Sequence, residues 1–325
     1  MLVETEPIPA TEEIFLHDVP LPLRATFFPL GFPLELATNS EAIIAAARTS
    51  WGNFPAKYEE TPLSLHLAVT GDGEPSGRPL FRSHQHLMSI VADAKNQVLC
   101  DFCRGSAAGW VTQSTVENPA AFRLRFLESS VMSMLVAAHL APVHSALVTR
   151  NGVGVALCGD SFAGKSTLSY ACARAGWTFI SDDGSFLLRK SQDRHGLGNP
   201  YNIRFREDAK RLFPELARFK VAQRQNGQLG MEVRTAELPV AISSGCSIDH
   251  LVFLRRSGSG PASLHRFAAS EALLWLERVP LYGPQEVQIS QRQAYRRLLD
   301  ASIWELRYSD LDDAIVVLNQ LGASV

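Results

Sequence analysis

Nine consecutive residues near the middle of the chain have the types and spacing of a phosphate-binding loop. They match the pattern G-x-x-x-x-G-K-[ST], in which the backbone turns several N–H groups toward an anion. The lysine reaches the β- and γ-phosphates of a nucleotide, and the next hydroxyl is a ligand of Mg²⁺. The pattern predicts a nucleoside triphosphate site made by Gly159, Asp160, Ser161, Phe162, Ala163, Gly164, Lys165, Ser166 and Thr167.

The segments on either side of this loop favour the same interpretation. An apolar run, Val153–Cys158, precedes the loop and predicts a strand, while the pattern of residues 166–175 predicts a helix. Strand, loop and helix in this order are the setting that the motif requires, and the helix dipole favours phosphate at the first turn. The alternative is a glycine turn that joins a strand to a helix and binds nothing, but such turns lack this setting.

Two acidic residues and a histidine could complete a catalytic site. Asp182 and Asp183 follow a predicted strand, Trp177–Ile180. One carboxylate there can help to hold Mg²⁺, and the other can accept the proton of an attacking hydroxyl. The alternative is that both are turn residues before Gly184. His144 begins another predicted strand, where a lone histidine is more often a packed residue than a catalyst.

Residues 144–183 resemble the catalytic core of the HPr kinase/phosphorylase family, bacterial P-loop kinases that share their fold with phosphoenolpyruvate carboxykinase. The family pattern is a histidine at a strand start, a Gly-x-Gly turn, a Gly-Asp-Ser-x-x-Gly-Lys-Ser loop, an Arg-Gly pair and an Ala-Asp-Asp end. Without a gap, this chain has His144, Gly152-Val-Gly154, the loop from Gly159 to Ser166, Ala175-Gly176 and Ser181-Asp-Asp183.

The resemblance implies an α/β fold with a P-loop kinase core, the substrate ATP, the cofactor Mg²⁺ and a role for each matching residue. Asp183 would be the general base toward a serine hydroxyl, and His144 would tune its protonation. Lys165 would neutralise charge on the transferred phosphoryl group, and Ser166 would hold Mg²⁺ together with Asp182. Members of the family form hexamers, so the resemblance also implies a homo-oligomer.

The chain departs from the family pattern at several positions. Thr167 stands where the family has glutamate, and Asn202-Ile-Arg-Phe205 stands in place of Glu-Ile-Arg-Gly. Whether Glu207 replaces the metal-binding glutamate of that signature is open. The segment 239–245 lacks the arginines of the corresponding family loop. Whether HPr is the acceptor and whether phosphorolysis is retained therefore stay open, and we expect the acceptor to be a serine, in a protein or in a small molecule.

The length of 325 residues predicts two domains. We expect a strand-rich α+β domain over residues 1–135 and the nucleotide-binding α/β domain over residues 136–325. The first domain could dock on the second or recognise the substrate. We predict that the Pro-rich residues 1–33 are extended or partly disordered. The other elements expected are strands at 63–70, 201–206 and 250–254, a hairpin of 87–92 with 97–102, and helices at 41–49, 271–278, 291–301 and 311–321.

Composition excludes some classes of partner. The formal net charge of −2 argues against nucleic acid. The most apolar stretch, residues 130–148, is interrupted by His139, Pro142 and His144, so we expect a buried helix and strand and no membrane span. Five scattered cysteines and the lack of a signal peptide pattern favour the cytoplasm. Cys100 and Cys103 are half of a zinc motif without a second half, and we expect no zinc there.

These observations leave a preferred function and a rival. The preferred one is an ATP-dependent kinase that acts on a hydroxyl. The rival is a nucleotide-binding regulatory or scaffold protein with weak ATPase activity, which the missing arginines favour. A carboxykinase-type enzyme acting on an oxo-acid would need more histidine and arginine sites than the sequence offers.

Overall fold

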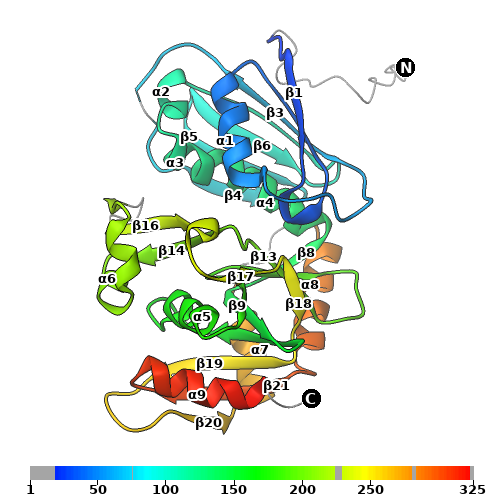
Figure 1. Ribbon diagram of the computed structural model, residues 1–325. Coiled ribbons are helices and arrows are strands. Elements are labelled where there is room, and N and C mark those ends of the chain that lie inside the picture. Colours follow the sequence, from blue (N-terminus) through cyan, green and yellow to red (C-terminus); the bar gives the residue numbers. More distant parts are fainter. Residues whose placement is uncertain (1–18, 75, 224–228, 280–282, 323–325) are drawn as a thin grey trace. The chain divides into compact units, whose positions relative to one another are not determined.

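The computed structural model describes residues 19–74, 76–223, 229–279 and 283–322 (Figure 1). It is a mixed α/β structure with several sheets, in agreement with the predicted α/β class. The chain forms two compact units, Met1–Ala138 and His139–Val325. The boundary predicted from the sequence, between residues 135 and 136, lies three residues earlier, within the helix Glu128–Ala138.

The first unit is built on one seven-stranded sheet with the order β1-β2-β3-β7-β6-β5-β4. The pairs β2/β3 and β3/β7 are parallel and the others antiparallel. Helices α1 and α4 pack on the sheet. The elements are β1 (Leu23–Phe27), β2 (Leu34–Thr38), α1 (Glu41–Trp51), β3 (Leu63–Val69), β4 (Leu80–His84), β5 (Leu87–Asp93), β6 (Asn96–Asp101), β7 (Ser106–Val111), α2 (Gln113–Val116), α3 (Pro119–Phe122) and α4 (Glu128–Ala138).

The expected helix at 41–49, strand at 63–70 and hairpin of 87–102 are confirmed as α1, β3 and the antiparallel pair β5/β6. For residues 1–33, the expected extended conformation is confirmed over Leu23–Phe27 and is wrong over Pro29–Gly31. Residues 23–27 form β1, paired with β2, and Pro29–Gly31 form a buried 3-10 turn, because Phe27 and Leu30 bury their side chains in the core. Residues 1–18 lie outside the described part.

The second unit is centred on a seven-stranded sheet with the order β17-β11-β9-β10-β19-β21-β20. Strands β10, β19 and β21 are parallel, as in α/β proteins. Its elements are β8 (Leu140–Val143), β9 (Ser145–Arg150), β10 (Val153–Cys158), α5 (Lys165–Arg174), β11 (Thr178–Ser181), β12 (Ser185–Leu188), β13 (His195–Gly198), β14 (Asn202–Arg206), α6 (Ala209–Leu212), β15 (Ala222–Gln223), β16 (Leu229–Arg234), β17 (Ala241–Ile242), β18 (Gly245–Ser247), β19 (His250–Arg256), β20 (Ser263–Arg266), α7 (Ala269–Leu276), α8 (Gln285–Leu298), β21 (Ser302–Tyr308) and α9 (Leu311–Leu321).

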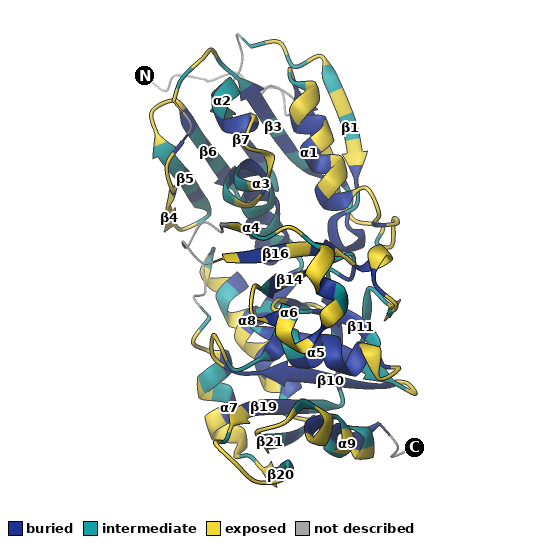
Figure 2. Cartoon of the chain, turned by 60° about the vertical axis from the view of Figure 1, so that its left-hand side comes forward, coloured by how far each residue is buried: buried dark blue, intermediate teal, exposed yellow. Residues whose placement is uncertain are grey.

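Each face of this sheet has its own core. One core contains residues of α7, α8 and the small sheet β18-β13-β12-β8, and the other contains residues of α5 and α9. A third core joins the opposite side of α5 to the sheet β14-β16-β15. Strand β10, which leads into the phosphate-binding loop, is therefore buried along its whole length (Figure 2).

The later helices and one strand differ from the expectations. Helix α8 begins at Gln285, six residues before the expected start, and it ends at Leu298. Strand β21 was not expected. Two of its seven residues, Glu305 and Arg307, are charged, and charged residues are more typical of an exposed segment. Leu306 and Tyr308 of the same strand are nevertheless buried. Its parallel pairing with β19 is a long-range contact that local periodicity does not reveal.

At two neighbouring places the chain passes from one sheet of the second unit to another. The chain passes from β8 in the small sheet to β9 in the large sheet at His144, and from β11 back to β12 across residues 182–184. The two antiparallel pairs keep one register across this crossing, since Ser181 pairs with Leu147 on one side and Ser185 with Val143 on the other. This register places residue 144 opposite residue 184, next to Asp183.

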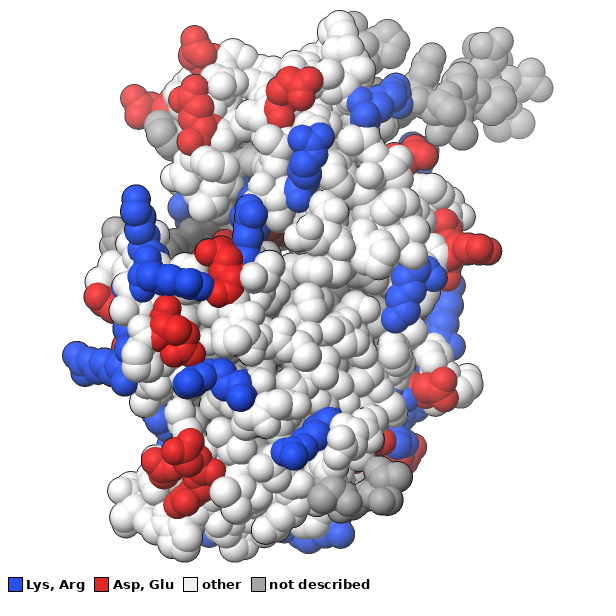
Figure 3. Space-filling model, in the orientation of Figure 1, with Lys and Arg blue, Asp and Glu red and all other residues white. Residues whose placement is uncertain are grey.

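None of the helices in the described residues is long and apolar enough to cross a membrane. On the face shown in Figure 3, lysine and arginine side chains are interspersed with aspartate and glutamate.

We predict that Gly154→Ala destabilises the second unit. Its Cβ would lie 1.8 Å from the carbonyl oxygen of Ser247. The backbone of Gly154 is held from both sides, because its N–H donates to the Asp249 carboxylate at 2.8 Å and its oxygen accepts from Asp249 N at 2.9 Å. Overpacking of this kind costs at least about 2 kcal/mol of unfolding free energy. Chemical denaturation measures it, and Gly258→Ala, with nothing within 4 Å of its Cβ, is the matched control. Equal stability of the two variants would contradict the close approach.

Candidate active site

The phosphate-binding loop joins the buried strand β10 to helix α5. Gly164 caps this helix with a left-handed backbone, φ 98°. A Cβ at this position would lie 2.6 Å from the hydroxyl oxygen of Tyr308. That hydroxyl donates to the carbonyl oxygen of Ala163 at 2.9 Å, so the last residue of β21 is hydrogen-bonded to the loop. The glycine of the motif is required both by its conformation and by this contact.

Lys165 is the charged centre of the site. Only 5% of its side chain is exposed. Its ammonium donates to the carbonyl oxygen of Gly159 at 2.8 Å and lies 2.9 Å from His144 Nε2 and 3.3 Å from Asp183 Oδ1. A buried ammonium is costly unless it is paired and hydrogen-bonded, and these three groups satisfy it. The structure therefore brings together three of the residues singled out in the sequence.

The surroundings of His144 favour the neutral form of its imidazole. Burial lowers the pKa of its imidazole, and the Lys165 ammonium lowers it further, while Asp183 and Asp160 act in the opposite direction. A neutral Nε2 can accept a hydrogen bond from the ammonium, which places the ring proton on Nδ1. His144 Nε2 also lies 3.7 Å from Asp183 Oδ1. The histidine thus separates Lys165 from solvent without adding a positive charge.

The two aspartates point to different surroundings. The side chain of Asp183 is 60% exposed and is available to a molecule from outside. The carboxylate of Asp182 accepts from the backbone N–H of Arg204 at 2.7 Å, and its carbonyl oxygen accepts from the Ser166 hydroxyl at 3.3 Å. Burial raises the pKa of the Asp182 carboxyl to about 6, although the N–H of Arg204 opposes this shift. The pair predicted from sequence therefore consists of one open and one enclosed carboxylate.

The oxygen donors near Ser166 suit Mg²⁺. The Ser166 hydroxyl is a hard donor and lies 3.3 Å from the backbone carbonyl oxygen of Asp182. The Asp182 carboxylate is a second hard donor, and it accepts from the backbone N–H of Arg204. The described residues contain no group of three or more His, Cys, Asp or Glu side chains that could hold a metal alone. Mg²⁺ commonly takes one or two protein ligands and completes its shell with water and substrate phosphates, so the donor set fits this ion.

Residues far away in the sequence complete the site, and the sequence motifs gave no signal for them. Helix α7 supplies Trp275, whose indole N–H donates to Asp160 Oδ1 at 3.4 Å. Arg278, just beyond α7, forms an ion pair with the same oxygen at 3.3 Å. On the other side of the loop, the guanidinium of Arg206 lies 3.4 Å from the ring centroid of Phe162. Glu207, considered above as a metal ligand, is exposed just after β14.

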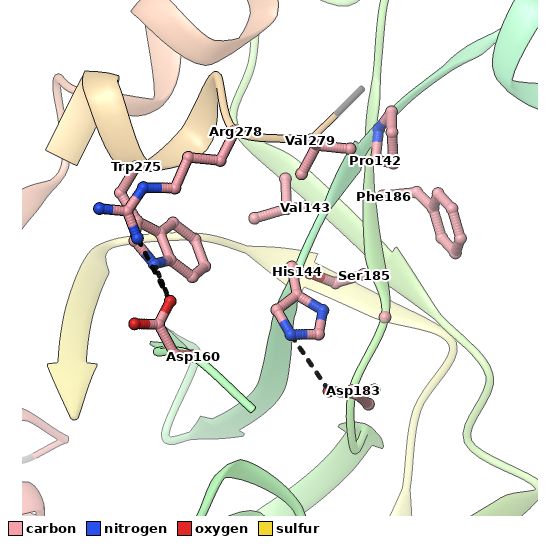
Figure 4. Close-up of a pocket in the computed structure, with 11 residues that line it drawn as sticks. Pro142, Val143, His144, Asp160, Asp183, Ser185, Phe186, Trp275, Arg278 and Val279 are labelled. Carbon is pink, nitrogen blue, oxygen red and sulfur yellow. Dashed lines mark hydrogen bonds and ion pairs between the residues drawn. The ribbon is translucent and has the colours of Figure 1, made fainter. Parts of the chain in front are cut away.

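A cavity of about 400 Å³ lies beside these residues (Figure 4). Asp183 and His144 line it on the side of Lys165, and Trp275 and Arg278 line it from α7. Its remaining walls come from β8, from β12 and the turn before it, from the loop and from the end of α7. They are Pro142, Val143, Asp160, Gly184, Ser185, Phe186 and Val279.

No protein-family model matches this chain, and no curated protein matches it. A similar solved structure is that of the Hpr(Ser) kinase/phosphatase from Coxiella burnetii. It has 12% sequence identity and a TM-score of 0.30, and the match covers 57% of this chain and 99% of that chain. At this TM-score the likeness is a weak link at the level of the fold and decides nothing about activity.

We predict that His144 titrates below its ordinary pKa of 6.5 and that its two charged neighbours move it in opposite directions. Asp183→Asn removes a charge that raises the pKa and should lower it further. Lys165→Met removes a charge that lowers the pKa and should raise it. Histidine NMR chemical shifts against pH measure all three values. Shifts of the same sign in the two variants would rule out the contacts described here.

Proposed function

We propose that this chain is an ATP-dependent kinase, similar in its site to HPr kinase, that transfers the γ-phosphoryl group to a hydroxyl. The observation that carries the proposal is the contact of the phosphate-loop lysine with both other candidate groups. Lys165 Nζ lies 2.9 Å from His144 Nε2 and 3.3 Å from Asp183 Oδ1. A phosphate-binding loop thus has a potential general base beside its cation, as phosphoryl transfer to a hydroxyl requires.

In this proposal the loop and its helix bind and orient the triphosphate. Backbone N–H groups from Gly159 to Lys165 and the N-terminus of α5 face the anion. The positive charge of the Lys165 ammonium stabilises the negative charge of the phosphoryl group that is transferred. Mg²⁺, held by Ser166 and Asp182, would supply further neutralisation of the phosphate charge.

Asp183 is the proposed general base. Its exposed carboxylate lines the cavity, so a hydroxyl that enters the cavity can reach it. The imidazole of His144 accepts from Lys165, and its Nε2 lies 3.7 Å from the carboxylate of the proposed base. The histidine therefore orients the lysine and leaves the carboxylate as the proton acceptor.

The rival function is a nucleotide-binding regulatory or scaffold protein with weak ATPase activity. The absence of arginine from residues 239–245 favours it, since the corresponding segment in the resembled family is rich in arginine. The rival needs the loop but no base, because water can be the acceptor. The two functions therefore differ in what Asp183 does.

We predict that Asp183→Asn lowers phosphoryl transfer from γ-labelled ATP to an acceptor at least about a hundredfold, because general base catalysis contributes on that order. Lys165→Met should weaken ATP binding at least about tenfold, since it removes a charge-assisted phosphate contact. Labelling of bacterial lysate or of metabolite pools and calorimetry with an ATP analogue measure the two effects.

The exposed Asp72 of the first unit provides the matched control Asp72→Asn, which should retain both properties. Label that moves only to water, or equally in Asp183→Asn, would falsify the kinase assignment in favour of the rival. Unchanged ATP affinity in Lys165→Met would remove the loop from both functions.

The pKa of Asp182 predicts a pH dependence of Mg²⁺ binding. With a pKa of about 6, the carboxyl holds a proton below pH 6, and the metal must displace it. The affinity for Mg²⁺ in the presence of an ATP analogue should therefore be constant above about pH 7 and fall up to about tenfold per pH unit below pH 6. Titrations at pH 5 to 8 measure it. Asp182→Asn should bind more weakly and depend less steeply on pH, because only the terminal phosphate of the nucleotide still takes up a proton at about pH 6. An unaltered profile in that variant would exclude Asp182 as a ligand.

A further inference from the structure

We propose that the cavity beside Asp183 is the acceptor site and that the acceptor is a small alcohol with an uncharged, apolar body. This inference rests on the proposed function and narrows it, because that function leaves the acceptor open between a protein serine and a small molecule. Three properties of the cavity carry it: the position of the base, the chemistry of the walls and the size.

The position of Asp183, the proposed general base, indicates that the cavity holds the phosphate acceptor and not the nucleoside of ATP. Asp183 and His144 line the cavity, and Lys165 Nζ contacts both of them from the loop. In phosphoryl transfer the attacking and leaving oxygens lie on opposite sides of the phosphorus atom. If the attacking hydroxyl is next to Asp183, the rest of the nucleotide extends away from this cavity.

The walls are apolar and are held in place. The ring of Trp275 packs edge-on against Phe253 at 5.3 Å, and its N–H is already donated to Asp160. The indole therefore presents hydrocarbon, with no spare donor, to the cavity (Figure 4). The same character is shared by four other lining residues, Pro142, Val143, Phe186 and Val279. Such walls gain free energy by contact with an apolar body of the ligand.

The charges at the rim offset each other. Arg278 and Asp160 form an ion pair at 3.3 Å, and both side chains are largely exposed. An uncharged ligand leaves this ion pair intact, and Asp183 would repel an anion close to the reacting hydroxyl. The body of the acceptor is therefore uncharged.

The size of the cavity favours a whole small molecule over a serine on a folded protein. A volume of about 400 Å³ lies within the range of small-molecule sites. A serine side chain offers a single CH₂OH group, which would leave Trp275 and Phe186 without contact. An alcohol with an aromatic or aliphatic body fills the cavity while its hydroxyl reaches Asp183.

In the proposed transfer, the alcohol takes the γ-phosphoryl group and loses its proton, and ADP is the leaving group. Asp183 takes the proton of the alcohol, and the alcohol oxygen forms a bond to the γ-phosphorus of ATP. The bond from that phosphorus to the oxygen bridging to the β-phosphate breaks, and ADP leaves with the electron pair. The products are ADP and the phosphate monoester of the alcohol, and the proton on Asp183 passes to solvent.

The test uses the full chain with γ-labelled ATP and Mg²⁺. Three acceptors are compared: 2-phenylethanol, glycerol, which has primary hydroxyls but no apolar body, and dephosphorylated casein as a source of protein serine. We expect ester formation from 2-phenylethanol to exceed that from glycerol at least tenfold. Trp275→Ala and Phe186→Ala should each raise the KM for 2-phenylethanol at least tenfold. Trp304→Ala, a tryptophan change away from the cavity lining, is the matched control and should have no effect.

Several outcomes overturn the inference while the kinase assignment stands. They are equal labelling of glycerol and 2-phenylethanol, preferred labelling of casein, or an unchanged KM in both cavity variants. Displacement of 2-phenylethanol by adenosine, seen by saturation-transfer NMR, would identify the cavity as a nucleoside site and overturn it as well.

The same NMR measurement separates this inference from the proposed function when no acceptor is labelled. If the protons of the 2-phenylethanol ring make no contact with the wild-type protein, the cavity assignment is wrong. If they do, and Trp275→Ala abolishes the contact while Lys165→Met does not, the cavity binds such an alcohol and the failure lies with the kinase activity.

Discussion

The site is organised around one buried positive charge. The ammonium of Lys165 is almost fully enclosed, and a cation removed from water must find partners in the protein or destabilise the fold. Its partners come from three segments: the carbonyl oxygen of Gly159 in the loop, the imidazole of His144 and the carboxylate of Asp183. The requirement to neutralise this charge therefore ties the loop to two other parts of the sheet. The same contacts place the carboxylate of Asp183 next to the cation, so the groups that stabilise the buried charge are also the candidate catalytic groups.

The crossing of the chain between two sheets makes this arrangement possible. Strands β8 and β9 run on from each other with His144 between them, and β11 and β12 run on from each other across Asp182 and Asp183. Next to the crossing, the buried hydroxyl oxygens of Ser145 in β9 and Ser185 in β12 lie 2.6 Å apart, and their hydrogen bond links the two strands. Residues at such a crossing leave the regular pairing of both sheets, so their side chains can turn toward the loop. The register of β11 with β9 shifts at a bulge between Phe179 and Ser181, and the register from Ser181 to Ser185 then brings Asp183 close to His144.

The sequence was sufficient for the part of the site that is local. A continuous motif with a strand before it and a helix after it predicts the loop, and the acidic pair at the end of a strand predicts its neighbours, because both signals depend on short-range geometry. Trp275, Arg278 and Tyr308 could not be predicted in the same way. They reach the loop from α7 and β21, more than a hundred residues away, and no local pattern records such a contact. The start of α8 and the strand β21 were missed for the same reason, since their pairing and packing are long-range.

Helix α7 has a consequence for how proteins of this architecture can diverge. The predicted phosphate-binding residues come from the loop and α5, whereas two residues that line the cavity, Trp275 of α7 and Arg278 just beyond it, belong to a separate segment. Trp275 packs against the core on its own side of the sheet. Substitutions along this one helix can reshape the cavity while the loop backbone and Lys165 keep their partners. The lining of the cavity and the backbone of the loop are in this sense independent parts of the fold.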